Sequence, residues 1–146
     1  MATLETYGFE DLDDVYKKIM DIPWEVTESA LNGMAAVAAE KVKSQGEAMG
    51  VRDPESDVHI LDKIVLRKAK KTEFGGVQNI SFSGSRTRGE KGTKTRNAEI
   101  AFIKEYGKRT QAARPFISTA LNQYTDQITN PGADAILDWI EKEWKN

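Results

Sequence analysis

The side chains that most often serve as catalytic bases and nucleophiles are scarce in this sequence. His59 is the only histidine, and the absence of cysteine excludes thiol nucleophiles, thiolate metal sites and disulfides together. A serine hydrolase would have to use His59, yet no Gly-x-Ser-x-Gly turn is present to expose a serine. We therefore interpret His59 as a structural or surface residue and predict no catalytic residues.

Carboxylates are plentiful, but none forms a recognisable site. Asp53, Glu55 and Asp57 alternate like the first ligands of a calcium-binding loop, whereas Val58 and Ile64 stand where that loop needs glycine and glutamate. No glycine-rich phosphate-binding loop ending in lysine is present. No pair of carboxylates is divided between an apolar and a polar setting, as acid–base catalysis requires. We predict a protein that is not an enzyme and binds no metal and no cofactor.

A run of basic residues between Gly84 and Arg96 is the best candidate for a binding site. It contains no apolar residue and only one acid, Glu90, so we expect a mobile loop. Its cations could contact DNA phosphates, although aromatic residues for base stacking are absent from it. A solvated or partner-ordered loop is the competing interpretation, and a loop lining a channel that DNA crosses fits both. The candidate DNA-channel or partner contacts are Arg86, Arg88, Lys91, Lys94 and Arg96.

Charge is distributed unevenly along the chain. Residues 1–50 carry ten acidic and four basic side chains, whereas residues 51–96 carry six acidic and eleven basic ones. Identical subunits with one acidic and one basic surface attract each other head to tail. Solvated charge scattered over the surface is the alternative, and the sequence does not decide between the two.

Length and composition are typical of a single folded domain covering residues 1–146. The acidic start, with Glu5 and Glu10, lacks the basic and apolar regions of a secretory signal. No stretch approaches the roughly 18 apolar residues of a membrane helix. We expect a protein made in a reducing cytoplasm, without membrane contact.

Apolar spacing predicts two helices in the first third of the chain. The first covers residues 9–20 and ends before Pro23, because the residue preceding a proline avoids helical geometry. The second begins between Pro23 and Thr27 and ends near Met49. Its alanine-rich middle permits another backbone to approach closely.

A β-hairpin is expected over residues 64–83. Ile64 and Leu66 lie on one face of a first strand of about eight residues. The segment 72–76 supplies the turn, because its paired glycines adopt positive φ at little cost. Val77 is out of phase with the rest of the second strand, which indicates a bulge or an edge position.

Three further helices complete an α+β fold, with helices at both ends of a small antiparallel sheet. One covers residues 98–106 and ends at Gly107. The next has Pro115 at its first position, and the last begins with Asn130 as N-cap and Pro131 as first helical residue.

Two of these segments carry a family resemblance in their order and spacing. Residues 101–107 read AFIKEYG and residues 112–117 read AARPFI, followed by Ala120 and Leu121. They resemble the lambdoid-type bacteriophage tail-component family, whose members are called head–tail joining, neck or tail-completion proteins. That family has an aromatic–acidic–aromatic–Gly segment, a short loop, and Ala-x-Pro-Phe opening a helix. The matched fold positions are Glu105, Tyr106, Gly107, Arg114, Pro115 and Phe116.

The resemblance covers residues 27–128 and includes weaker features upstream. Residues 61–64, LDKI, are similar to the family's entry into its first strand, as is the alanine-rich helix before them. The sequence departs from the family at Lys108, where threonine is frequent, and in its long basic segment. The final helix, with its two tryptophans, lies outside the pattern.

The resemblance implies a structural protein of the virion that forms a homo-oligomeric ring around the DNA channel between head and tail. Its partners would be further copies of itself, neighbouring head-connector and tail proteins and, transiently and non-specifically, packaged DNA. A tail terminator or minor capsid component is the alternative within this class, and a small nucleic-acid-binding module using the basic loop is the alternative outside it. We expect the motif residues to serve the fold, with Tyr106 and Phe116 in the core.

Overall fold

A computed structural model of the chain describes residues 9–52, 59–88 and 90–145, apart from the side chains of residues 9–11 and Arg88. Glu5, Asp53, Glu55 and Asp57 lie outside this description. The described chain is α+β, as the sequence predicts. In chain order its elements are α1 (Phe9–Met20), α2 (Trp24–Ala48), the 3-10 helix η1 (Ile60–Lys63), β1 (Ile64–Leu66), β2 (Lys70–Thr72), β3 (Gly75–Val77), β4 (Ile80–Phe82), β5 (Ser85–Arg88), β6 (Thr93–Arg96), α3 (Asn97–Tyr106), α4 (Phe116–Gln123) and α5 (Thr125–Lys145).

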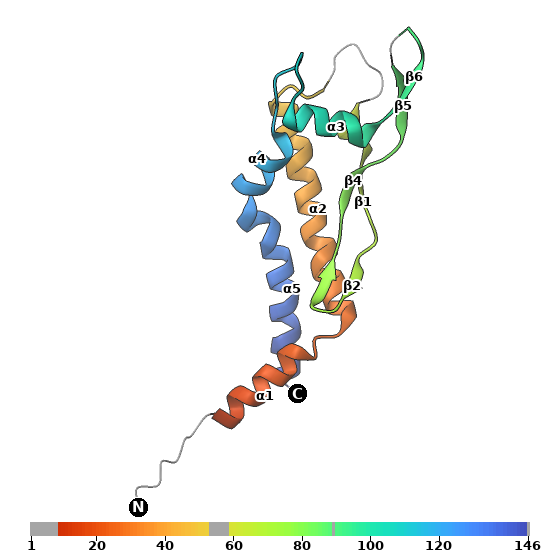
Figure 1. The fold of residues 1–146 in the computed structure, drawn as a ribbon. Helices are drawn as coiled ribbons and strands as arrows, with labels where there is room; N and C mark the ends of the chain where they lie inside the picture. The colour runs from red at the N-terminus through yellow and green to blue at the C-terminus, as the bar shows by residue number, and fades with distance from the viewer. Residues whose placement is uncertain (1–8, 53–58, 89, 146) are drawn as a thin grey trace, which may run out of the picture.

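The long helix α2 is the centre of the fold. Helix α5 runs along one side of it and the hairpin of β1 to β4 lies along another (Figure 1). A Cβ atom on Gly132 of α5 would collide with the Met34 side chain of α2, and one on Gly33 would lie 3.2 Å from Cβ of Pro131. Ala30 is buried beside this crossing. The predicted close approach of a second backbone to the alanine-rich helix is confirmed.

The apolar core lies where the end of α2 meets η1, α3 and α4. Phe116 is completely buried there, and Leu61 and Ile100 are each 1% exposed. A Cβ atom on Gly46 of α2 would come within 2.5 Å of Leu61. Phe82 of β4 meets the Phe116 ring edge-on, with centroids 6.2 Å apart. The core therefore joins elements from both ends of the chain.

The predicted hairpin exists, but its ladder is interrupted. Ile64 pairs with Phe82 and Lys70 pairs with Val77, so three residues (67–69) face two (78–79). The first strand thus has one extra residue, which forms a β-bulge. The sequence indicated a bulge or an edge position at Val77 of the second strand, whereas the extra residue lies in the first strand, between Leu66 and Lys70. The interruption also divides the expected strand of eight residues into β1 and β2.

The paired glycines fit the prediction only in part: Gly75 has a positive φ of +139°, but it follows the turn instead of forming it. The turn itself consists of Glu73 and Phe74, while both glycines belong to β3. A Cβ atom on Gly76 would lie 2.8 Å from Leu31 and 2.9 Å from Trp24. Gly76 therefore allows the hairpin to lie directly against α2.

The last helix begins earlier than the sequence predicts. Helix α5 starts at Thr125 and contains Pro131 in its interior, so the predicted start at Asn130 is wrong. A proline inside a helix costs roughly 3 kcal/mol because it removes a hydrogen bond and crowds the preceding turn. Its ring here packs against Gly33 of α2, where no side chain intervenes. Packing between the two long helices outweighs the local cost.

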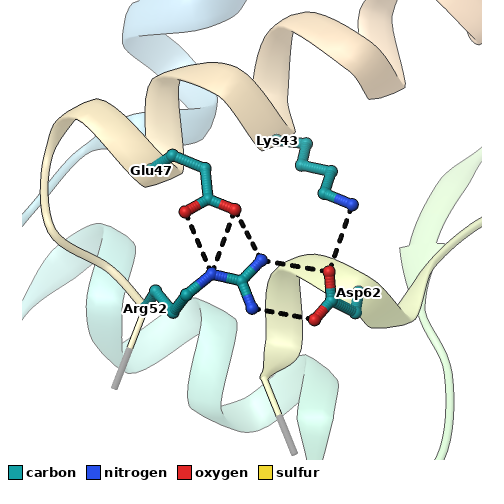
Figure 2. A network of polar contacts seen from close by, with 4 residues as sticks. All are labelled: Lys43, Glu47, Arg52 and Asp62. Carbon is teal, nitrogen blue, oxygen red and sulfur yellow. Dashed lines mark hydrogen bonds and ion pairs between the residues drawn. The ribbon is translucent and has the colours of Figure 1, made fainter. Parts of the chain in front are cut away.

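An ion-pair network fastens the end of α2 to η1 (Figure 2). Arg52 donates through Nε to the Glu47 carboxylate at 3.0 Å and through Nη1 to Asp62 Oδ2 at 2.8 Å. Lys43 Nζ lies 3.1 Å from Asp62 Oδ1. The hydrogen bonds from Arg52 lower the pKa of Glu47 and of Asp62, and Lys43 lowers the pKa of Asp62 further. A carboxylate with a lowered pKa stabilises the fold above its unfolded pKa and loses that contribution as the pH falls.

We predict that Arg52→Gln lowers the thermal unfolding midpoint at pH 7 and has a smaller effect at pH 3. Unfolded carboxyls titrate near pH 4, so the network contributes fully at pH 7 and less at pH 3, where protonation has begun to remove it from the wild type too. Circular dichroism melts at both pH values measure the difference. Lys17→Gln is the control, because it breaks only the exposed pair with Asp13 in α1. Equal midpoint losses for Arg52→Gln at the two pH values would contradict the prediction.

Candidate functional site

The basic segment 84–96 forms a hairpin rather than the predicted irregular loop. Strands β5 and β6 pair antiparallel, with Arg86 opposite Thr95 and Thr87 opposite Lys94. Hydrogen bonds between the two strands satisfy their backbone N–H and C=O groups, and β-branched threonines favour strands. The segment can therefore form a hairpin without apolar side chains. We call residues 85–96 the basic hairpin. Its mobility stays a prediction.

The predicted cations are spread around this hairpin. Residues directly across a ladder share a face and neighbours alternate, so Arg86 and Lys94 lie on opposite faces. Lys91 and Lys94 are exposed, and Lys91 precedes the turn residue Gly92, whose φ is +60°. Arg96 forms an ion pair of 2.9 Å with Glu99. Arg88 pairs with Thr93 in the ladder, and its side chain lies outside the described residues.

Asn97 anchors the base of the basic hairpin. Its backbone N–H donates to the Gly84 carbonyl at 3.0 Å, and its side-chain Nδ2 donates to the Ser83 carbonyl at 2.7 Å. Asn97 is only 1% exposed and is also the first residue of α3. From this anchor the hairpin projects beyond the first residue of α3, away from α1 (Figure 1). It is an arm able to reach anionic groups such as phosphates or carboxylates.

Glu105 of the family motif has a structural role that its spacing did not reveal. Its side chain is buried, and its carboxylate accepts hydrogen bonds from the backbone N–H groups of Ile117 at 2.8 Å and Ser118 at 3.0 Å. The Ser118 hydroxyl donates to the same carboxylate at 2.6 Å. Pro115, at the N-cap of α4, has no side-chain oxygen for this purpose. Glu105 therefore caps α4 from a different helix.

The remaining motif residues shape the connection between α3 and α4. Gly107 has a φ of +76°, and a Cβ atom there would lie 2.8 Å from the backbone nitrogen of Ala113. The sequence predicted Pro115 as the first residue of α4. In the structure Pro115 is the N-cap, and Phe116 is the first helical residue. The Arg114 guanidinium donates to the Gly50 carbonyl just beyond α2. Phe116 is in the core, as expected.

Tyr106 is not in the core, so the prediction for this residue is wrong. It is 68% exposed and lies against Phe102, which is 63% exposed, with ring centroids 4.7 Å apart. Consecutive helical residues point in different directions, so the burial of Glu105 turns Tyr106 outward. The two rings border a hollow between α3 and α4. We call this area the α3–α4 surface. It is lined by Glu105 and Ser118 and by the apolar or aromatic residues Phe82, Ala98, Ala101, Phe102, Tyr106, Ile117 and Leu121.

The described residues can be compared with the requirements of a metal site and of a membrane-spanning helix. Within them, no group of three histidine, cysteine, aspartate or glutamate side chains could hold a metal ion. None of the described helices is both long and apolar enough to span a membrane. His59 is half-buried at the start of η1, where its carbonyl accepts a hydrogen bond from the Asp62 N–H at 3.1 Å.

No protein-family model, curated protein or solved structure matches this chain. The resemblance to phage tail components therefore rests on the quoted residues alone.

We predict that Glu105→Ala lowers the free energy of unfolding by about 1–3 kcal/mol, because two N–H groups at the start of α4 lose their buried acceptor. Chemical denaturation measures the change. Glu99→Ala is the matched control on the same helix, since its exposed pair with Arg96 is worth at most about 1 kcal/mol. Equal effects of the two substitutions would contradict the capping role of Glu105.

Proposed function

We propose that this chain is a non-enzymatic structural protein of a tailed bacteriophage, located in the virion at the head–tail joint. Copies of the chain assemble there as a ring around the DNA channel, in contact with head-connector and tail proteins. The family resemblance of residues 101–121 supports this proposal. A tail terminator or a minor capsid component remains the alternative position within the same class.

The observation that carries the proposal is the basic hairpin. In a ring whose hairpins point inward, Lys91 and Lys94 would meet the phosphates of passing DNA. The hairpin contains no aromatic residue to stack on bases, so such contacts are independent of sequence. A channel requires contacts of this kind, because tight or sequence-specific binding would hold the DNA in place.

The structure of the motif supports the same proposal in a second way. Glu105, Gly107 and Phe116 hold α3 and α4 together, so these positions serve the fold rather than a reaction. A subunit that works mechanically needs a fixed relation between its contact surfaces. The hydrogen bonds from α4 to Glu105 fix α4 against α3 at the end of the molecule that bears the basic hairpin (Figure 1).

We predict that the purified protein, or the protein within virions, forms closed rings of a single stoichiometry. Light scattering over a range of concentrations and negative-stain microscopy measure this for the pure chain. Mass spectrometry of purified particles tests its presence in the virion. A chain that stays monomeric and is absent from every particle would show the proposal to be wrong.

A small nucleic-acid-binding module is the second candidate, and the exposed lysines of the basic hairpin favour it. If that candidate is right, the free chain binds DNA firmly, with a log–log salt slope of about −4 for four phosphate contacts. Binding should then vanish when Arg86, Arg88, Lys91, Lys94 and Arg96 are replaced by serine.

The head–tail proposal expects weak DNA binding by the unassembled chain. Serine at Lys68, Lys70 and Lys71 is the matched control, because these cations lie in or next to the other hairpin. Filter binding at low salt distinguishes the two candidates. Tight binding that is lost only in the basic-hairpin variant would favour the second one.

A further inference from the structure

Helix α1 exposes an apolar stripe that the described part of the chain leaves uncovered. Leu12, Tyr16 and Met20 stand at i, i+4 and i+8 and are 52%, 67% and 82% exposed. The adjoining edge of the same stripe, Val15 and Ile19, lies against the end of α5. There it borders a small pocket with Trp139, Ile140 and Trp144. We call the outward residues Leu12, Tyr16 and Met20 the α1 stripe.

The α3–α4 surface presents a matching pattern on the opposite end of the molecule. Ala98, Phe102 and Tyr106 also stand at i, i+4 and i+8, and all three are exposed. Leu121 of α4 borders the same hollow and is 42% exposed. Ridges at i, i+4 spacing on two helices interdigitate, which is the commonest mode of helix packing. An amphipathic helix laid in a hydrophobic groove is likewise a recurring mode of recognition.

The two surfaces cannot meet within one chain. Helix α1 lies at one end of the long α2–α5 pair, and α3 and α4 lie at the other (Figure 1). The α1 stripe can therefore reach an α3–α4 surface only on another molecule.

Charge favours pairing between unlike surfaces over pairing of each with itself. Helix α1 carries four acidic residues and two basic ones, and one of its acids, Asp13, pairs with Lys17. The segment 96–114, which contains α3 and leads to α4, carries five basic residues and two acidic ones, and Arg96 pairs with Glu99. Two α1 helices face to face would bring their surplus negative charges together, whereas α1 against α3–α4 brings an acidic helix to a basic segment.

We infer that the α1 stripe of one copy docks onto the α3–α4 surface of the next copy. The inference rests on the proposed ring and identifies its contact. The contact is heterologous, because different patches of identical subunits meet, and such a contact generates a ring when its rotation closes. Large exposed apolar areas on a protein mark interaction sites, and this docking covers both areas at once.

The absence of native cysteine permits a direct test by disulfide formation. Chains carrying Tyr16→Cys are mixed with chains carrying Leu121→Cys and oxidised mildly. We expect a cross-linked dimer to form at least about tenfold faster than when Lys17→Cys, on the polar face of α1, replaces Tyr16→Cys, since only contacting thiols pair readily. Equal rates for the two mixtures would overturn the inference.

A mixing experiment tests the head-to-tail direction of the contact. The helix variant carries Leu12→Ser and Tyr16→Ser, and the surface variant carries Phe102→Ser and Tyr106→Ser. Each alone should associate at least about tenfold more weakly than the wild type, as loss of a buried aromatic anchor does. An equal mixture should give heterodimers that grow no further, because each pair retains one intact contact. All four side chains are exposed, so circular dichroism should find the fold retained.

The outcomes separate this inference from the proposed function. Rings of the wild type, with no preferential cross-link in the mixture of the Tyr16→Cys and Leu121→Cys chains, would overturn the docking and leave the ring, as would rings formed by each serine variant alone. A wild type that forms no rings, together with cysteine variants that give no preferential cross-link, would overturn both. Heterodimers in the mixture, measured by light scattering, would support the docking.

Discussion

The hydrogen bonds of Glu105 fix the end of the molecule on which its proposed activity depends. A carboxylate at 4% exposure must find partners, and it finds them in the free N–H groups at the start of α4. This side chain ties α3 to the first turn of α4, next to Phe116 in the core. The connection that follows needs Gly107, because only glycine fits its positive φ and its contact with the neighbouring backbone.

The same constraint determines which residues face outward. With Ile100 and Glu105 directed inward, Phe102 and Tyr106 stand on the opposite face of α3 and remain exposed. The exposed aromatic pair is therefore a consequence of the internal cap, and it lies next to the base of the basic hairpin at Asn97. Core residues, the apolar surface and the base of the cationic arm all lie in or beside α3.

The far end of the molecule is held differently. Helix α1 contacts the body through Val15 and Ile19 at the tryptophans of α5, and Leu12, Tyr16 and Met20 are exposed. Between the two ends, α2 and α5 pack closely where Gly33 and Gly132 cross. A body with unlike surfaces at its two ends has the shape that repeated head-to-tail contact requires.

The sequence by itself determined the elements with strong local signals. Apolar spacing predicted α1 and α2 nearly to the residue, and Gly107 marked the end of α3, because both signals act within a few residues. The tertiary structure decided what depends on distant partners. The basic segment became a hairpin through cross-strand bonds, and Pro131 entered the interior of α5 because Gly33 leaves room for its ring. The cap on α4 came from Glu105 on a neighbouring helix, and Tyr106 turned outward as a result, since no local pattern records which helix will stand beside it.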